Sequence, residues 1–210
     1  MAVVPGLKSG VASTKRQRVV ALALPNFQLQ GTISHSLANL SFLRELNLGN
    51  YFFHGDIPYG LGNLRRLQVI NFRNNKLQGS IPTSLFQHER IRVISLAFNK
   101  LNSEMWKGPW NVPELRVLDL SNNNLGLFHQ NYWGFNISSL EYIAFTANNL
   151  TGRIPATTGR NLPNLIAFYL GLNQLEEEFA KYITNASRLY GLVLARNFFT
   201  GIIPANLGDS

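Results

Sequence analysis

Apolar residues recur along most of the chain at intervals of 24 or 25 residues. The residues that begin the successive intervals are Val19, Leu43, Leu67, Ile91, Leu115, Leu140, Leu165 and Leu189. Further apolar side chains follow each of them three and five positions later, as Leu46 and Leu48 follow Leu43. Consecutive copies of one apolar spacing predict a repeat protein in which each copy is one structural unit.

The alternation inside each copy predicts one short β-strand per repeat. Alternate residues of a strand point to the same face, so the apolar pair enters the core and its neighbours point outward. A single repeat cannot bury its own apolar face, and the core therefore forms between stacked neighbours. We predict one domain over residues 19–210 with a parallel sheet and an incomplete last repeat. We expect residues 1–18 to be a poorly ordered segment or a degenerate cap.

Most repeats carry an asparagine eight residues after the first apolar position. These asparagines are Asn75, Asn99, Asn123, Asn148, Asn173 and Asn197. An inward amide can pair with backbone groups that a turn leaves without partners, and each unpaired buried group costs about 1–3 kcal/mol. We therefore predict a structural ladder of asparagine side chains. Phe27 and Tyr51 take the equivalent positions in the first two repeats, so the ladder should be missing there.

A second sequence motif, in which glycine is followed by isoleucine and proline, recurs after the asparagine positions. It occurs at 55–58, 79–82, 152–155 and 201–204, with a variant at 31–34. Glycine permits a tight turn, and proline fixes an extended backbone without an amide donor. The motif resembles the L-x-G-x-I-P segment of plant-specific leucine-rich repeats, which implies a second row of short strands. The predicted fold is an α/β repeat solenoid, a curved leucine-rich-repeat horseshoe with a parallel concave sheet.

The first repeat narrows this resemblance. Arg16–Val19, Ala21–Pro25 and Leu29–Ser34 are similar to the first repeat of plant leucine-rich-repeat receptor kinases of the immune-receptor type. The resemblance implies an extracellular ectodomain at the plasma membrane that binds a peptide or protein ligand and a co-receptor, in defence or developmental signalling. The sequence shows no signal-peptide pattern, cysteine, membrane-spanning run or kinase motif, so we expect the N-terminal portion of a longer ectodomain.

Two alternative hypotheses remain open from the sequence. One is a secreted protein similar to the leucine-rich-repeat inhibitors of polygalacturonases, although those proteins carry cysteine-tied caps at both ends. The other is a truncated fragment without an independent function. The genomic sequence beyond Ser210 would separate the three hypotheses, because each expects a different continuation of the chain.

The outward positions of the predicted sheet form the candidate ligand surface. Tyrosine and arginine are favoured as anchors in protein interfaces. The proposed ligand-binding residues are Arg73, Phe98, Asp119, Tyr142, Tyr169, Tyr190 and Arg196. The alternative interpretation is a solvated sheet face with incidental aromatic residues.

Four N-x-S/T sequons lie in the convex or lateral parts of the predicted repeats. The candidate glycosylation sites are Asn39, Asn136, Asn149 and Asn185.

The remaining composition favours binding over catalysis. The net charge is +8, but basic residues adjoin one another only near Lys15–Arg18 and Arg65–Arg66, and no stacking platform accompanies them. This pattern argues against a nucleic-acid partner. The histidines lie at non-equivalent places in different repeats, without carboxylates at metal-ligand spacing. We therefore expect no enzyme activity, no metal and no cofactor.

Overall fold

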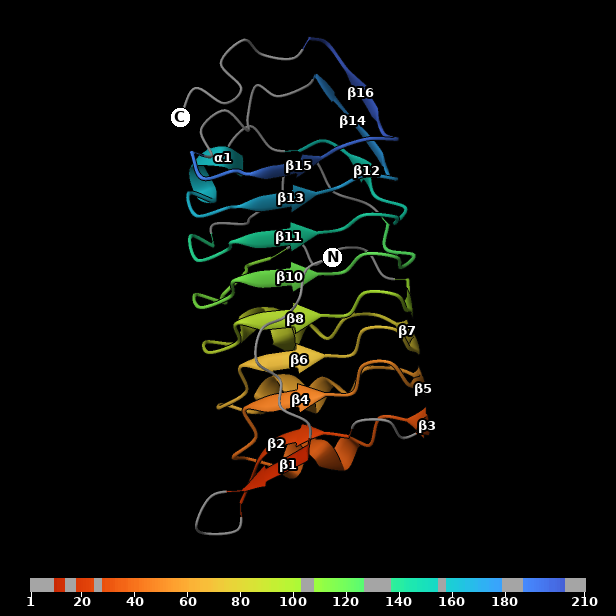
Figure 1. The fold of residues 1–210 in the computed structure, drawn as a ribbon, viewed down its shortest axis with the longest axis vertical. Helices are drawn as coiled ribbons and strands as arrows, with labels where there is room; N and C mark the ends of the chain where they lie inside the picture. The colour runs from red at the N-terminus through yellow and green to blue at the C-terminus, as the bar shows by residue number, and fades with distance from the viewer. Residues whose placement is uncertain are drawn as a thin grey trace.

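The chain folds into an elongated solenoid whose strands stack along one long axis (Figure 1). The computed structural model describes residues 10–13, 18–24, 28–102, 108–126, 137–154, 158–178 and 187–202. Its main sheet has nine strands in the order β1-β2-β4-β6-β8-β10-β11-β13-β15. These strands are β1 (Gly10–Ser13), β2 (Val19–Ala23), β4 (Glu45–Asn47), β6 (Val69–Asn71), β8 (Val93–Ser95), β10 (Val117–Asp119), β11 (Tyr142–Ala144), β13 (Ala167–Tyr169) and β15 (Gly191–Val193).

Equivalent residues of successive repeats lie opposite one another in this sheet. Leu46 pairs with Ile70, and Ile70 pairs with Ile94, all in parallel strands. All three side chains are fully buried, and they belong to one continuous apolar core. The parallel concave sheet of a leucine-rich-repeat horseshoe is thus confirmed.

The first edge of the sheet is covered by β1, which lies inside the N-terminal segment. This strand pairs antiparallel with β2, and its register shifts between Ala12 and Ser13. The pairing provides backbone partners for the edge of β2, which would otherwise remain open to another chain.

A second row of short strands runs beside the main sheet, as the L-x-G-x-I-P resemblance implies. It consists of two sheets with parallel pairing between repeats. Its strands are β3 (Gln30–Thr32), β5 (Phe52–Gly55), β7 (Lys76–Gly79), β9 (Lys100–Leu101), β12 (Thr151–Gly152), β14 (Gln174–Glu178) and β16 (Phe198–Thr200). Gly55 and Gly79 end their strands at φ of 78° and 73°, a conformation that glycine adopts at little steric cost.

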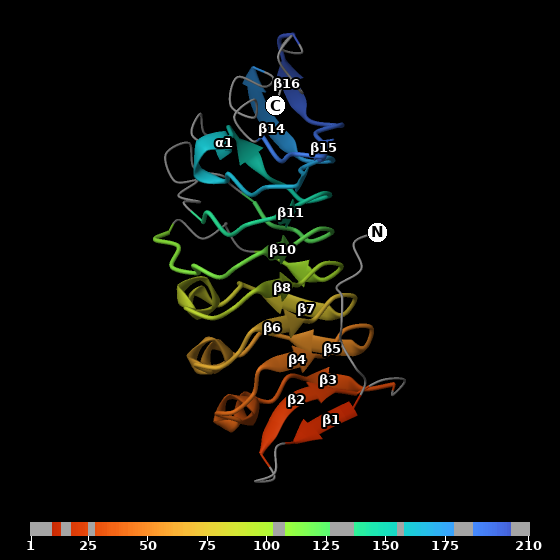
Figure 2. The same ribbon diagram turned by 60° about the vertical axis from the view of Figure 1, so that its left-hand side comes forward.

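In the part of the chain that the structure describes, the helices are short and lie on one side of the solenoid (Figure 2). Three are 3-10 helices, η1 (His35–Asn39), η2 (Tyr59–Asn63) and η3 (Thr83–Gln87), and one is a short α-helix, α1 (Thr158–Asn161). Pro58 and Pro82 precede η2 and η3. The α/β fold class is confirmed, with helices that serve only to return the chain to the next strand.

The predicted asparagine side chains point inward and pair with the backbone of neighbouring repeats. Asn123 accepts a hydrogen bond from the Leu101 amide at 3.0 Å and donates to the carbonyls of Leu96 and Leu120 at 3.1 and 3.0 Å. The same arrangement recurs at Asn75, Asn99, Asn148, Asn173 and Asn197. Each side chain therefore ties its own turn to the turn and strand of the preceding repeat.

Tyr51 fills the ladder position of its repeat with an aromatic ring. The ring is largely buried and lies edge-on to Phe53, with centroids 5.6 Å apart. Burial raises the pKa of the Tyr51 hydroxyl. Phe27, the equivalent residue of the first repeat, lies outside the described residues.

The residue before each ladder position adopts a left-handed backbone conformation. Its φ lies between 55° and 65° at Asn50, Asn74, Phe98, Asn122, Ala147, Leu172 and Arg196. Asparagine tolerates this region better than other residues that carry a Cβ atom. The repeats with alanine, leucine, phenylalanine or arginine at this position therefore carry backbone strain.

Ala147→Asn is expected to raise the free energy of unfolding by about 0.5–1 kcal/mol, because asparagine relieves part of this strain. Asn122→Ala, the reverse change one repeat earlier, should lower it by a similar amount. Urea unfolding of both variants tests the prediction. Unchanged midpoints in both would show that the left-handed turn carries no such cost.

Candidate functional site

Asp119 stands at the centre of the concave sheet face, at the end of β10. Its side chain is largely buried, with 12% exposed. Oδ1 accepts a hydrogen bond from the Ser121 amide at 3.1 Å, and Oδ2 accepts one from Nη1 of Arg73 at 3.2 Å. The carboxylate is thus held by the turn that follows its own strand and by a cation from two repeats earlier.

Arg73 reaches Asp119 across the repeat that contains Ser95 and Ala97. Both intervening side chains are small and buried, so they leave the space above β8 open to the arginine. The guanidinium carbon of Arg73 also lies 4.5 Å from the ring centroid of Phe98. Because the arginine side chain is 41% exposed, the ion pair contributes no more than about 1 kcal/mol, and its main effect is to fix both side chains.

Tyr142 and Tyr169 extend this cluster toward the C-terminal repeats. Their rings meet edge to face, with centroids 5.5 Å apart and planes at 88°. Burial, with smaller effects from Asp119 and Tyr169, raises the pKa of Tyr142 to about 12, while Arg73 acts in the opposite direction. The Tyr142 hydroxyl is neutral at physiological pH, as an unperturbed tyrosine also is, and it can donate a hydrogen bond.

Small residues surround the two tyrosines on the sheet. A Cβ atom at Gly191 would lie 2.8 Å from the Tyr169 hydroxyl, so glycine is what allows that ring to lie over β15. Ala144 and Ala167, on the neighbouring strands, are buried. These small residues leave room on the sheet face for the two aromatic rings.

Five of the seven predicted ligand residues thus form two contacting groups whose nearest members, Asp119 and Tyr142, lie on the paired strands β10 and β11, and we call the five residues the concave cluster. Its members are Arg73, Phe98, Asp119, Tyr142 and Tyr169. Tyr190 is 95% exposed and Arg196 is also exposed. Among the described residues, no hydrogen bond or ring contact joins either of them to the cluster.

The sequence analysis missed the ion pair that organises this cluster, although it selected both residues separately. Arg73 and Asp119 are 46 positions apart, close to two repeat lengths. The two residues are not at equivalent repeat positions, since Arg73 follows Leu67 by six residues and Asp119 follows Leu115 by four, so a comparison of equivalent positions would not have found the pair.

Two of the candidate glycosylation sites fall in the described part of the chain. Asn39 is exposed at the end of η1, and Asn149 is exposed in the segment that bridges to Gly126. Asn136 and Asn185 lie outside the described residues.

The described residues form neither a metal-binding cluster nor a membrane-spanning helix. No group of three or more histidine and acidic side chains in them is placed to hold a metal ion. None of the helices in the same ranges is both long and apolar enough to span a membrane.

Comparisons with known proteins agree with the repeat architecture. The family model "Leucine Rich Repeat" matches residues 66–88 and 114–135. No curated protein sequence matches the chain.

Solved structures of plant receptor kinases share this fold. The ectodomain of GASSHO1/SCHENGEN3 from Arabidopsis thaliana is 29% identical, with a TM-score of 0.78, over 96% of this chain and 27% of that one. The PEPR1–AtPEP1 structure is 29% identical, with a TM-score of 0.79, over 90% and 26%. The Arabidopsis HAESA ectodomain shows the likeness in fold alone, at 24% identity and a TM-score of 0.84, over 91% and 32%.

The chain thus spans between a quarter and a third of the length of these three structures. Its repeat period, its two rows of strands and these similarities agree with one another. The protein is a leucine-rich-repeat solenoid that matches part of a plant receptor-kinase ectodomain.

Proposed function

We propose that the concave cluster binds a peptide or protein ligand, and that the chain acts as the recognition segment of a plant cell-surface receptor kinase. The observation that carries the proposal is the concave cluster itself, a group of side chains that are held in place by contacts with one another on the concave face of the sheet. Arg73 and Asp119 supply hydrogen-bonding groups at one end, and the paired rings of Tyr142 and Tyr169 supply apolar contact area at the other. Preorganised aromatic and charged side chains of this kind are typical interface anchors.

Similar structures support a ligand of this class. GASSHO1/SCHENGEN3 was solved in complex with CASPARIAN STRIP INTEGRITY FACTOR 2. HAESA was solved with the peptide hormone IDA and the co-receptor SERK1, in a structure that is 27% identical to this chain with a TM-score of 0.72. By analogy, we propose that an extended peptide lies across the concave cluster and that a co-receptor docks beside it.

The proposal places the chain on the extracellular side of the plasma membrane. In that setting, Asn39 and Asn149 would be available for N-linked glycosylation, since both are exposed and neither belongs to the concave cluster. A defence or developmental role would follow from the identity of the ligand.

Tyr169→Ala is expected to weaken peptide binding by about 1–2 kcal/mol, or roughly 5- to 30-fold in Kd, because it removes one of the two paired rings. Phage-displayed random peptides would be selected on the wild-type chain, and those that bind would be titrated by calorimetry. The control is Tyr59→Ala, which truncates an exposed tyrosine on η2, away from the sheet. Equal losses in the two variants would contradict a concave ligand site.

A further inference from the structure

The solenoid gathers arginines from separate repeats on the flank where the chain enters the main sheet. This flank is turned toward the viewer in Figure 2. Every one of these arginines lies within two residues of the first apolar position of a repeat. They are Arg18, Arg44, Arg65, Arg66, Arg90, Arg92, Arg116 and Arg188. Most of them are far apart in sequence, but stacked repeats lie only about 4.8 Å apart, the spacing of neighbouring strands.

Two of the three arginines in the upper part of this arginine flank form ion pairs with neighbouring carboxylates. Arg92 pairs with Glu114 at 2.8 Å, and Arg116 pairs with Glu141 at 3.4 Å. Arg188 donates to the side-chain oxygen of Asn164 at 2.8 Å. The two ion pairs reduce the charge that Arg92 and Arg116 offer to a partner, whereas the neutral Asn164 amide leaves the charge of Arg188 in place.

The lower part of the flank keeps its positive charge. Arg44, Arg65 and Arg90 form no ion pair with any residue in the described ranges. Arg18 and Arg66 lie one repeat below and one repeat above Phe42, with guanidinium carbons 4.0 and 4.3 Å from its ring centroid. Such contacts hold the cations in place without neutralising them.

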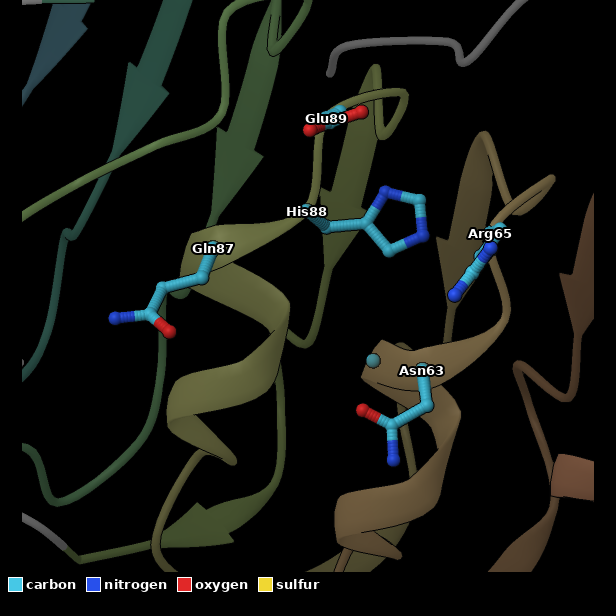
Figure 3. A pocket seen from close by; sticks show the side chains of 6 residues that line it. Asn63, Arg65, Gln87, His88 and Glu89 are labelled. Atoms are coloured by element: carbon cyan, nitrogen blue, oxygen red, sulfur yellow. The ribbon is translucent and has the colours of Figure 1, made fainter.

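A polar hollow of about 560 Å³ opens within this lower part, between the ends of η2 and η3 (Figure 3). One repeat contributes Asn63 and Arg65 to its lining, and the next contributes Gln87, His88 and Glu89. The lining side chains thus comprise two amides, one guanidinium, one carboxylate and one imidazole.

His88 forms part of the wall of the hollow and is itself fully engaged. It is 4% exposed, its Nε2 lies 2.9 Å from the Leu64 carbonyl, and its Nδ1 accepts a hydrogen bond from the Arg90 amide at 3.1 Å. The exposed side chains around it are therefore the groups that a ligand would meet.

We propose that the hollow and the lower arginine flank bind a linear acidic glycan, a chain of uronic acid residues. Amide side chains can donate hydrogen bonds to sugar hydroxyls and accept hydrogen bonds from them, and a carboxylate can accept them. Arginine pairs with a carboxylate through two parallel hydrogen bonds. Arg65 places such a group at the rim of the hollow. Arg44, Arg65 and Arg90 lie beside Leu43, Leu67 and Ile91, the first apolar positions of three successive repeats, so a polymer with one carboxylate per residue meets successive cations.

The same observations disfavour two other polyanions. An acidic protein segment would gain most from apolar pockets for its side chains, whereas the lining of the hollow is polar. A single-stranded nucleic acid would require aromatic rings free for base stacking, and Phe42 is already covered by two arginines.

The test measures calorimetric binding of galacturonic acid oligomers of defined length to the full chain. The double variant Arg65→Gln/Arg90→Gln should weaken binding by about tenfold or more, since it removes two carboxylate partners. The matched control is Lys76→Gln/Lys100→Gln, which removes the same charge from exposed residues on β7 and β9. The control should change binding by less than about twofold, because its effect is only long-range and screened.

A second variant separates sugar recognition from charge attraction. Asn63→Leu leaves the net charge unchanged but removes an amide from the hollow, and it should weaken galacturonate binding several-fold while leaving polyglutamate binding unaltered. Equal losses in the two double variants, polyglutamate binding as tight as galacturonate binding, or no galacturonate binding by the wild-type chain would each overturn the proposal.

Discussion

Asn123→Ala is expected to lower the free energy of unfolding by about 3 kcal/mol. The substitution leaves the Leu101 amide and the carbonyls of Leu96 and Leu120 without their side-chain partner in a site where Asn123 is only 6% exposed. Each unsatisfied buried group costs about 1–3 kcal/mol, and relaxation of the turn or entry of water recovers part of the total. Urea unfolding followed by circular dichroism measures the loss.

The neighbouring residue provides the matched control. Asn124 is exposed, so Asn124→Ala should change stability by less than about 0.5 kcal/mol. Hydrogen exchange gives a local measure that does not depend on two-state unfolding of a repeat protein. The Leu101 amide should exchange faster in Asn123→Ala, and unchanged protection there would contradict the structural role of the ladder.

The ladder and the core could be predicted from sequence because both repeat with the period of the chain. Once Leu46, Ile70 and Ile94 occupy equivalent places, their alignment in the sheet follows from the period alone. The inward asparagine follows for the same reason, since each repeat meets the same neighbour in the same way. Features that repeat in every copy can be predicted from the period alone, without knowing the length or direction of any side chain.

Features that connect unlike residues of different repeats could not be predicted in the same way. The Arg73–Asp119 ion pair depends on the small side chains of Ser95 and Ala97 in the intervening repeat. The left-handed turn at Ala147 depends on backbone geometry that its side chain does not favour. Both are properties of the stacked structure, and neither gives a local signal in the sequence.

The arginine flank shows the same limit for surface charge. Along the sequence, Arg44 has no other lysine or arginine within ten residues, and Arg90 has only Arg92 and His88 nearby, so the charge looks dispersed. The repeat period brings equivalent positions next to one another, so clustering has to be judged across repeats as well as along the chain. The hollow beside Arg65 is a feature of the surface shape, and the pattern of charges along the sequence does not predict it.

Gly62→Ala is the second substitution for which we expect a large effect, a loss of about 3 kcal/mol in the free energy of unfolding. Gly62 lies where η2 packs against η3, and Ser84 of η3 donates a hydrogen bond to the Tyr59 carbonyl at 2.8 Å. A Cβ atom at Gly62 would overlap the Ser84 side chain and lie 2.6 Å from its carbonyl carbon. Because backbone as well as side-chain atoms are in the way, the two turns must separate, and overpacking of this kind costs about 1–3 kcal/mol or more.

Gly126→Ala is the control for this prediction, since the nearest atom to its added Cβ would be the Asn149 carbonyl oxygen at 4.0 Å. We expect it to be neutral or slightly stabilising, through the lower conformational entropy of the unfolded chain. Ser84→Gly in the Gly62→Ala background should recover only part of the loss, because the carbonyl carbon of residue 84 remains in the way. Urea midpoints for the three variants decide the matter, and full recovery in the double variant would show that the conflict lies with the serine side chain and not with the backbone of η3.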